Sequence, residues 1–309
     1  MNTGAQIAMN QEASSSWEVE NVLLVNTSLP EITGKRYSSV ANAITYAKTQ
    51  SPGSTNPWAI YMPAGTYSDN IAVPSYIRIV GHNSGTRLTG QITSEGAWVA
   101  DVYEYIVENC YITNLTMGSS QALVLWKCIL GGGTPSDGDI AILNGIMRGT
   151  LDLSSLNDLW TFNATYFGLG TTLSLPASSN IYGSEFSGVL VSINLNGGDF
   201  NNTSFSVNVF GSGTYTCKDV TFGGPITLTA GMTLTARNCT LGGNLTVNGG
   251  TLNSYGCSGT INYSAGTWNN YGDRYDNRTS GLSATDEQSA IDELAATPSG
   301  VDIFLLMGA

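Results

Sequence analysis

The segment 237–247 reads Arg-Asn-Cys-Thr-Leu-Gly-Gly-Asn-Leu-Thr-Val, and it repeats the pattern of 218–228, Lys-Asp-Val-Thr-Phe-Gly-Gly-Pro-Ile-Thr-Leu. Shorter copies of the same pattern occur at 163–168, 202–205 and 256–259. A small residue follows the corner of each copy, at a step of about 17 to 20 residues along the chain. These residues are Cys110, Cys128, Ala164, Ser184, Thr203, Val220, Cys239 and Cys257. A fixed period of this size is typical of a solenoid, in which each repeat buries its apolar face by stacking on its neighbours.

Within each repeat, short segments alternate polar and aliphatic residues. In 226–228 and 245–247 a threonine stands between two aliphatic residues, which is the period of two expected of a strand with one buried face. Gly and Asn at the corners supply positive φ angles. Parallel strands stack about 4.8 Å apart, so about nine or ten coils would form a core on the order of 45 Å long. The predicted fold class is therefore all-β, a parallel β-helix solenoid.

The N-terminal part of the repeat region contains a second signal. Residues 37–50 are predicted to form a helix that Pro52 and Gly53 terminate, and apolar strands follow at 58–62 and 77–81. Pro63-Ala64-Gly65-Thr66-Tyr67 lies between the two strands. This order resembles the start of right-handed parallel β-helix proteins of the pectin-lyase-like type. The resemblance implies a right-handed β-helix with an N-terminal capping helix. It does not indicate an activity, because that fold serves lyases, hydrolases, adhesins and virus spikes.

The repeat stops near Tyr275, and a different pattern follows. Thr285 and Gln288 form a capping box, which predicts a helix over about 286–296. The run from Ser280 to Leu294 is similar to a segment of bacteriophage tail-fibre and virion-appendage proteins that joins or closes the fibre. We expect this helix and the apolar tail to form a trimerisation segment, to fold back as a cap, or to do both. The residues expected between chains are Ile291, Leu294, Phe304, Leu305 and Leu306.

The chain therefore divides into three predicted parts. Residues 1–35 are an attachment or lead-in segment, 36–275 form the β-helix, and 276–309 form the C-terminal helix and apolar tail.

Composition excludes several classes of function. Charged residues make up 11% of the 309, against roughly 25% in typical soluble domains, and the net charge is −12. This acidity argues against a nucleic-acid partner or an anionic membrane surface. No apolar run is long enough to span a membrane, and no secretory signal is visible, so we expect synthesis in the host cytoplasm. The five cysteines lack metal-ligand spacing and His82 is the only histidine, so no metal or cofactor is expected.

Few residues suggest catalysis, and none is assigned a catalytic role. Asp137 and Asp139 fit either a turn or a Ca²⁺ or acid/base pair, and the turn is the more common origin of Asp-Gly. Lys218 and Arg237 fall one coil apart, which predicts two neighbouring surface cations. Trp160 and Tyr166 belong to an aromatic cluster and are the candidate glycan-binding residues, although the same cluster fits a buried ladder inside the coil.

These features favour a structural virion protein of a bacteriophage. The expected molecule is a homotrimeric β-helical spike or fibre that recognises host-surface polysaccharide or decorates the capsid. Its N-terminal segment would bind other virion proteins. A polysaccharide-degrading tailspike, either a lyase or a glycoside hydrolase, is the alternative. The third hypothesis is an exported bacterial adhesin.

Overall fold

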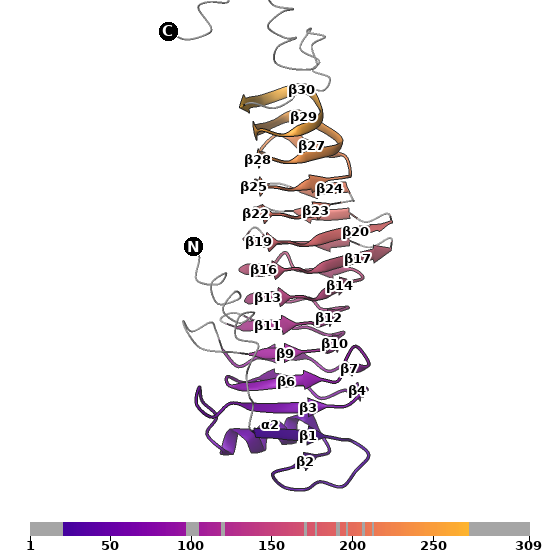
Figure 1. The fold of residues 1–309 in the computed structure, drawn as a ribbon, viewed down its shortest axis with the longest axis vertical. Helices are drawn as coiled ribbons and strands as arrows, with labels where there is room; N and C mark the ends of the chain where they lie inside the picture. The colour runs from indigo at the N-terminus through magenta and orange to yellow at the C-terminus, as the bar shows by residue number, and fades with distance from the viewer. Residues whose placement is uncertain are drawn as a thin grey trace, which may run out of the picture.

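The computed structural model describes residues 21–96, 105–118, 121–169, 172–176, 178–189, 192–195, 197–205, 208–211 and 213–271. These residues form an all-β parallel solenoid, an elongated stack of coils (Figure 1). Strands of successive coils pair in parallel and lie above one another in columns along the stack. The predicted parallel β-helix is confirmed.

The first column is the most continuous and carries the surface considered below. It consists of β1 (Asn21–Val25), β3 (Trp58–Met62), β6 (Ile77–Gly81), β9 (Ile106–Glu108), β11 (Ala122–Trp126), β13 (Asp139–Leu143), β16 (Asp158–Phe162), β19 (Ser179–Tyr182), β22 (Gly198–Asn201), β25 (Thr214–Lys218), β28 (Thr233–Arg237), and the last parts of β29 (Thr240–Tyr255) and β30 (Ser258–Tyr271). The stack thus already includes β1, which lies within the predicted lead-in segment.

Two further columns complete the coils. The second consists of β4 (Gly65–Tyr67), β7 (Thr86–Leu88), β10 (Tyr111–Ile112), β12 (Ile129–Leu130), β14 (Ile146–Arg148), β17 (Thr165–Leu169), β20 (Glu185–Val189), β23 (Ser204–Phe205), β26 (Thr221–Phe222) and the starts of β29 and β30. The third contains β15 (Leu151–Asp152), β18 (Thr172–Ser174), β21 (Ser192–Leu195), β24 (Asn208–Gly211), β27 (Ile226–Thr229) and the middle of β29 and β30. Nearer the N-terminus, β5 (Ile71–Val73) pairs with β8 (Ile92–Ser94), and β2 (Arg36–Tyr37) pairs with β1.

A helix forms where the sequence predicts one. Helix α2 (Val40–Thr49) lies at the N-terminal end of the stack (Figure 1) and contacts β1, β2 and β3. Ser39 is its N-cap, because the Ser39 hydroxyl accepts a hydrogen bond from the Asn42 backbone N–H at 3.1 Å. The helix begins later than the predicted Tyr37, since Tyr37 pairs with β1 as part of β2.

The corner between the first and second columns has a left-handed backbone in coil after coil. The residues there with positive φ are Asn109, Lys127, Asn144, Asn163, Gly183, Asn202, Asp219, Asn238 and Gly256. Gly takes this conformation freely and Asn and Asp take it at low cost, whereas other residues pay about 1–2 kcal/mol. The predicted role of Asn and Gly at the corners is confirmed, and Lys127 is the unfavourable member of the series.

Lys127→Asn is expected to stabilise the protein. Asn relieves the left-handed strain at φ 52°, and the loss of the Lys127 ammonium, 5.3 Å from the Trp126 ring centroid, offsets part of the gain. The expected increase in the free energy of unfolding is about 0.5 kcal/mol. Urea denaturation measures it, and the reverse change at an equivalent corner, Asn144→Lys, serves as the control with the opposite sign. A Lys127→Asn protein less stable than the parent would contradict this account of the corner.

The interior of the second column contains an aromatic ladder. Tyr166, Phe186, Phe205 and Phe222 occupy the same inward position in successive coils and are at most 3% exposed. Their ring centroids are 6.3, 4.9 and 5.5 Å apart in that order. The sequence was compatible with aromatic residues that bind glycan or that form a buried ladder inside the coil, and these four residues form a buried ladder.

Two predicted segments lie wholly or partly outside the described residues. The C-terminal part lies wholly outside them. It contains the helix predicted over 286–296 and the five residues expected to form the trimer contact, Ile291, Leu294, Phe304, Leu305 and Leu306. Of the lead-in segment, the structure describes residues 21–35.

Candidate functional site

The outer face of the first column is apolar in its middle part. Its residues alternate along the strands with inward residues such as Val107, Leu125 and Ile142, which belong to the interior core. We call this region the aromatic zone. It consists of Ile106, Val124, Trp126, Ala141, Leu143 and Trp160, with the half-buried Phe162 and Tyr182 packed against them. Its six core members are at most 9% exposed, so the Trp126 and Trp160 rings do not present open faces.

The two predicted glycan-binding residues lie on opposite sides of the coil wall. Trp160 belongs to the aromatic zone, with its ring parallel to that of Tyr182 at 6.2 Å, and it is 2% exposed. Tyr166 points into the core, is fully buried, and donates a hydrogen bond to the Gly149 carbonyl at 2.9 Å. A sugar has no access to the Tyr166 ring in this arrangement. The corner at Asn163 resets the strand alternation, and this places Tyr166 on an inward position.

Two carboxylates meet beside the aromatic zone. Asp139 and Asp158 are in register at the first positions of β13 and β16. The Asp158 carboxylate accepts hydrogen bonds from Trp160 Nε1 at 2.8 Å, Ser178 Oγ at 3.0 Å and Asn180 Nδ2 at 3.0 Å. Burial, together with the charges of Asp158 and Asp137, raises the pKa of Asp139. The two acids therefore occupy different environments, one hydrogen-bonded and one desolvated.

The sequence interpretation of these acids was incomplete. Asp137 does lie at a turn, where its carboxylate accepts the Gly138 backbone N–H at 2.7 Å. Asp139 instead begins a strand, and its neighbour is the residue one coil later, Asp158. The repeat period already indicated this pairing, because Asp139 and Asp158 are separated in the sequence by the length of one coil.

Asp139→Asn is expected to increase stability at neutral pH. An acid whose pKa is raised by folding favours the folded state when protonated, so the parent protein loses stability as pH rises from about 4 through the folded pKa. The variant lacks this loss, and it should be more stable by up to about 0.5 kcal/mol at pH 7 after allowance for solvent screening. Urea denaturation at pH 4 and pH 7 measures the difference. Glu185→Gln, at an exposed position of β20, is the matched control, and destabilisation by Asp139→Asn at pH 7 would contradict the prediction.

The N-terminal side of the aromatic zone ends in an ion pair. Arg78 of β6 and Glu108 of β9 are 3.1 Å apart, and their side chains are only 13% and 14% exposed. The Arg78 guanidinium lies 5.5 Å from the Trp126 ring centroid. Burial lowers the pKa of Arg78, and the adjacent Glu108 opposes that shift. The Arg78–Glu108 ion pair therefore borders the aromatic zone, with the Arg78 guanidinium near the Trp126 ring.

The C-terminal coils present a different surface on the same column. We call it the polar ladder, and it is formed by the outward residues of β25, β28 and the last parts of β29 and β30. In order along the stack these are Thr214, Thr216 and Lys218, then Thr233, Thr235 and Arg237, then Thr251, Asn253 and Tyr255, then Thr267, Asn269 and Tyr271. Lys218 and Arg237 are in register, as the sequence predicted.

Side chains of the polar ladder interact from coil to coil. Asn269 Nδ2 donates to Asn253 Oδ1 at 2.8 Å, and Asn253 Nδ2 donates to Thr235 Oγ1 at 3.3 Å. The Tyr255 and Tyr271 rings are stacked at 4.5 Å and 7°, and the Arg237 guanidinium lies 4.2 Å from the Tyr255 ring centroid. These contacts align hydroxyl, amide, aromatic and cationic groups in a regular array.

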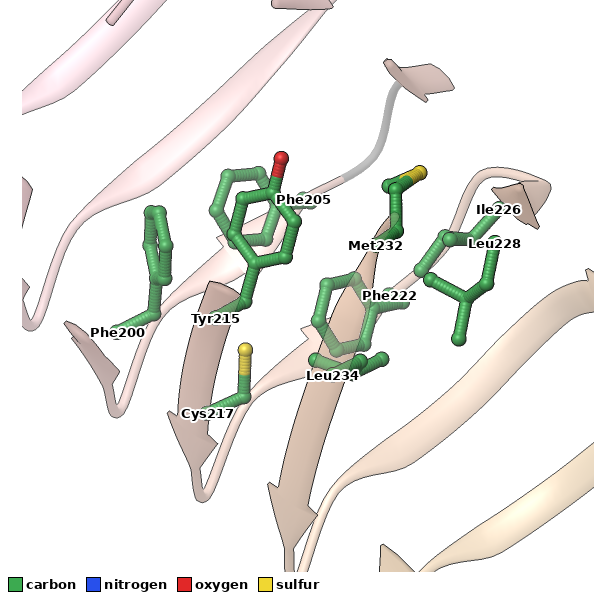
Figure 2. Close-up of a pocket in the computed structure, with 9 residues that line it drawn as sticks. All are labelled: Phe200, Phe205, Tyr215, Cys217, Phe222, Ile226, Leu228, Met232 and Leu234. Atoms are coloured by element: carbon green, nitrogen blue, oxygen red, sulfur yellow. The ribbon is translucent and has the colours of Figure 1, made fainter. Parts of the chain in front are cut away.

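A small cavity lies inside the same coils, with side chains converging on it from several strands (Figure 2). Its volume is about 20 Å³. It is lined by Phe200, Phe205, Tyr215, Cys217, Phe222, Ile226, Leu228, Met232 and Leu234. The space is close to that of one water molecule, and ligand pockets are at least ten times larger, so the cavity is a packing defect rather than a ligand site.

The cysteines are buried and free. All five, Cys110, Cys128, Cys217, Cys239 and Cys257, lie in the core. Burial raises the pKa of Cys128 to about 12 and that of Cys110 well above its ordinary value. The anchor cysteines are therefore small core residues, as the sequence predicted.

We expect none of the five thiols to react with a water-soluble disulfide reagent in the native protein at pH 8. Reaction requires an accessible thiolate, and burial removes both access and ionisation. Unfolding in denaturant should release all five at rates typical of free cysteine. Absorbance of the released chromophore counts them, and one fast-reacting thiol in the native state would contradict the burial of that residue.

Metal and membrane sites do not emerge from the described residues. Within them, no three or more His, Cys, Asp or Glu side chains are grouped so as to hold a metal ion. His82 Nδ1 instead shares a 2.6 Å hydrogen bond with the Tyr61 hydroxyl. None of the helices in the described ranges has the length and apolar character needed to cross a bilayer. No protein-family model and no curated protein sequence matches this chain.

Proposed function

We propose that this protein is a structural and recognition component of a bacteriophage virion, a homotrimeric spike or fibre that contacts polysaccharide on the host surface. The polar ladder is the observation that carries the proposal. It is an outward array on a continuous stack of coils, rich in hydroxyl and amide groups. Resemblance of residues 280–294 to fibre-joining segments supports the assignment to a virion.

The solenoid suits this role mechanically. Each coil contacts chiefly its two neighbours through parallel strand pairing, so the fold extends in one direction and holds its outer residues at fixed spacing. A rod of this kind displays a binding face at a distance from its base. Residues 1–35 would attach the base to other virion proteins, and the C-terminal segment would join three chains through Ile291, Leu294, Phe304, Leu305 and Leu306. Such a rod could alternatively be attached to the capsid as a decoration protein.

Labelling of intact virions tests the proposal. Antibody raised against the full chain and viewed by electron microscopy should mark the tail for an adsorption spike, or the head for a capsid fibre. If no particle carries the label, the virion role is rejected. Light scattering of the purified full chain should give three times the mass of the 32.5 kDa monomer, and a stable monomer would reject the trimer.

The pair of carboxylates favours polysaccharide cleavage as the second candidate function. Glycoside hydrolysis uses two acids, and different environments separate their roles as acid and as base or nucleophile. Asp139, with its raised pKa, and the hydrogen-bonded Asp158 show such a difference. Release of reducing ends from host polysaccharide tests this function. Activity should disappear in Asp139→Asn and in Asp158→Asn while Glu185→Gln retains it, and an inactive parent protein would reject cleavage.

A further inference from the structure

We propose that the polar ladder binds a carboxylate-bearing polysaccharide that runs along the axis of the solenoid. This names the ligand class of the recognition function proposed above and rests on it. The inference depends on three properties of the polar ladder, namely its accessibility, its repeat and its charge.

Accessibility distinguishes the polar ladder from the aromatic zone of the same column. The six core members of the aromatic zone are at most 9% exposed. Thr214, Thr216, Thr267 and Asn269 are exposed, and Tyr271 is 53% exposed. The Thr, Asn and Tyr members of the two middle coils are half-buried, namely Thr233, Thr235, Thr251, Asn253 and Tyr255. A ligand therefore meets hydroxyl and amide groups beside an aromatic ring. This is the combination that suits a sugar, which has hydroxyl groups at its edge and C–H groups on its faces.

The repeat of the polar ladder fits a polymer. Equivalent side chains recur once per coil, at about 4.8 Å along the axis. An extended chain of linked pyranose rings advances by a similar length per ring, so successive sugars meet equivalent groups on successive coils. The direct hydrogen bonds between Asn269, Asn253 and Thr235 fix the amide groups in place before a ligand arrives.

Charge selects an acidic polymer. Lys218 and Arg237 are exposed and in register, in a chain whose net charge is −12. Neither forms an ion pair within the described residues, where the salt bridges are Lys48–Glu95 and Arg78–Glu108. Packing against Tyr255 holds the Arg237 guanidinium, whose N–H groups match a carboxylate in geometry.

Acidic residues limit the site at its N-terminal side. Asp199 is in register with Thr216 one coil earlier, and Asp219 follows Lys218 at the corner. A bound carboxylate would meet repulsion beside Asp199. We therefore place the anionic groups of the ligand at Lys218 and Arg237, with the remainder of the chain extending over Asn253, Asn269 and Tyr271.

Binding of defined polysaccharides to the full chain tests this inference. The probes are polygalacturonate, alginate and hyaluronan, each paired with its carboxyl-reduced form, and titration calorimetry measures Kd at low and at physiological salt. We expect at least one acidic polymer to bind, its reduced form to bind at least about tenfold more weakly, and affinity to fall as salt increases.

Variants then locate the site. Lys218→Gln with Arg237→Gln should weaken binding of the acidic polymer about tenfold or more, and Tyr271→Ala should weaken the acidic and the reduced polymers alike. Arg148→Gln, an exposed cation on the outside of β14, is the matched control and should bind as the parent does. All these side chains are exposed, so folding should be unaffected, and circular dichroism checks it.

Three results would overturn the inference. These are absence of binding to every acidic probe, equal affinity for the reduced forms, and full affinity in the Lys218→Gln/Arg237→Gln variant. Virion labelling is independent of these titrations. A labelled virion with no acidic-polymer binding would reject this ligand class and leave the virion role standing, whereas unlabelled virions would reject the virion role itself.

Discussion

Phe205→Ala is expected to lower the free energy of unfolding by about 3–5 kcal/mol. Phe205 is 1% exposed and lies at the centre of the aromatic ladder. Its ring centroid is 4.9 Å from that of Phe186 and 5.5 Å from those of Phe200 and Phe222. Truncation removes these contacts and opens a void beside the existing cavity, and the stacked coils resist collapse because their strand spacing is fixed by hydrogen bonds.

Phe205→Leu is the matched control for this variant. It keeps most of the side-chain volume and is expected to cost less than about 1.5 kcal/mol. Urea denaturation gives the change in midpoint, and hydrogen exchange locates it. Because coils interact chiefly with their neighbours, loss of protection should concentrate in β20, β23 and β26. Equal costs for the Ala and Leu variants, or a uniform loss of protection, would contradict the proposed role of the ladder.

Arg78→Met is expected to cost about 3 kcal/mol, the second large effect. The substitution leaves Glu108 with a side chain only 14% exposed and without its 3.1 Å partner. A carboxylate removed from water and deprived of its counter-charge is strongly unfavourable. The loss of the guanidinium packed near Trp126 adds a smaller amount.

A double-mutant cycle separates the ion pair from packing. Arg78→Met combined with Glu108→Met removes both charges, and the apolar side chains can pack against the aromatic zone, so most of the stability lost in Arg78→Met should return. Thermal and urea denaturation of the four proteins give the coupling energy. A double variant less stable than Arg78→Met alone would show that the pair, rather than the orphaned charge, dominates.

The repeat in the sequence was sufficient to predict the parallel solenoid, because its signals are local. Corners require residues that accept positive φ, and strands require alternation, so both recur at the coil period. The prediction nevertheless missed one coil between Cys128 and Ala164. Gly145 occupies the equivalent position there, preceding Ile146, which pairs with Ile129. With no side chain, Gly145 gave no sign of the small anchor residue.

The candidate surface was less accessible to sequence reasoning. Lys218 and Arg237 were placed correctly one coil apart, since both lie in well-aligned repeats. The pairing of Asp139 with Asp158 was not found, because register between adjacent coils depends on how many residues each corner uses. The polar ladder was also missed, since its residues are ordinary Thr and Asn and only their alignment makes them an array.

The class of fold and the corner chemistry follow from the repeat pattern alone, whereas the side of each strand that faces the core depends on how the coils stack. Strand β11 shows the reason, because Ala122–Trp126 is apolar throughout and its alternation has no polar side. Only stacking in register places Leu123 and Leu125 inside and Val124 and Trp126 in the aromatic zone. Stacking in register likewise places Tyr166 in the core and Trp160 on the outer face, because the direction of a side chain follows from the path of the whole coil.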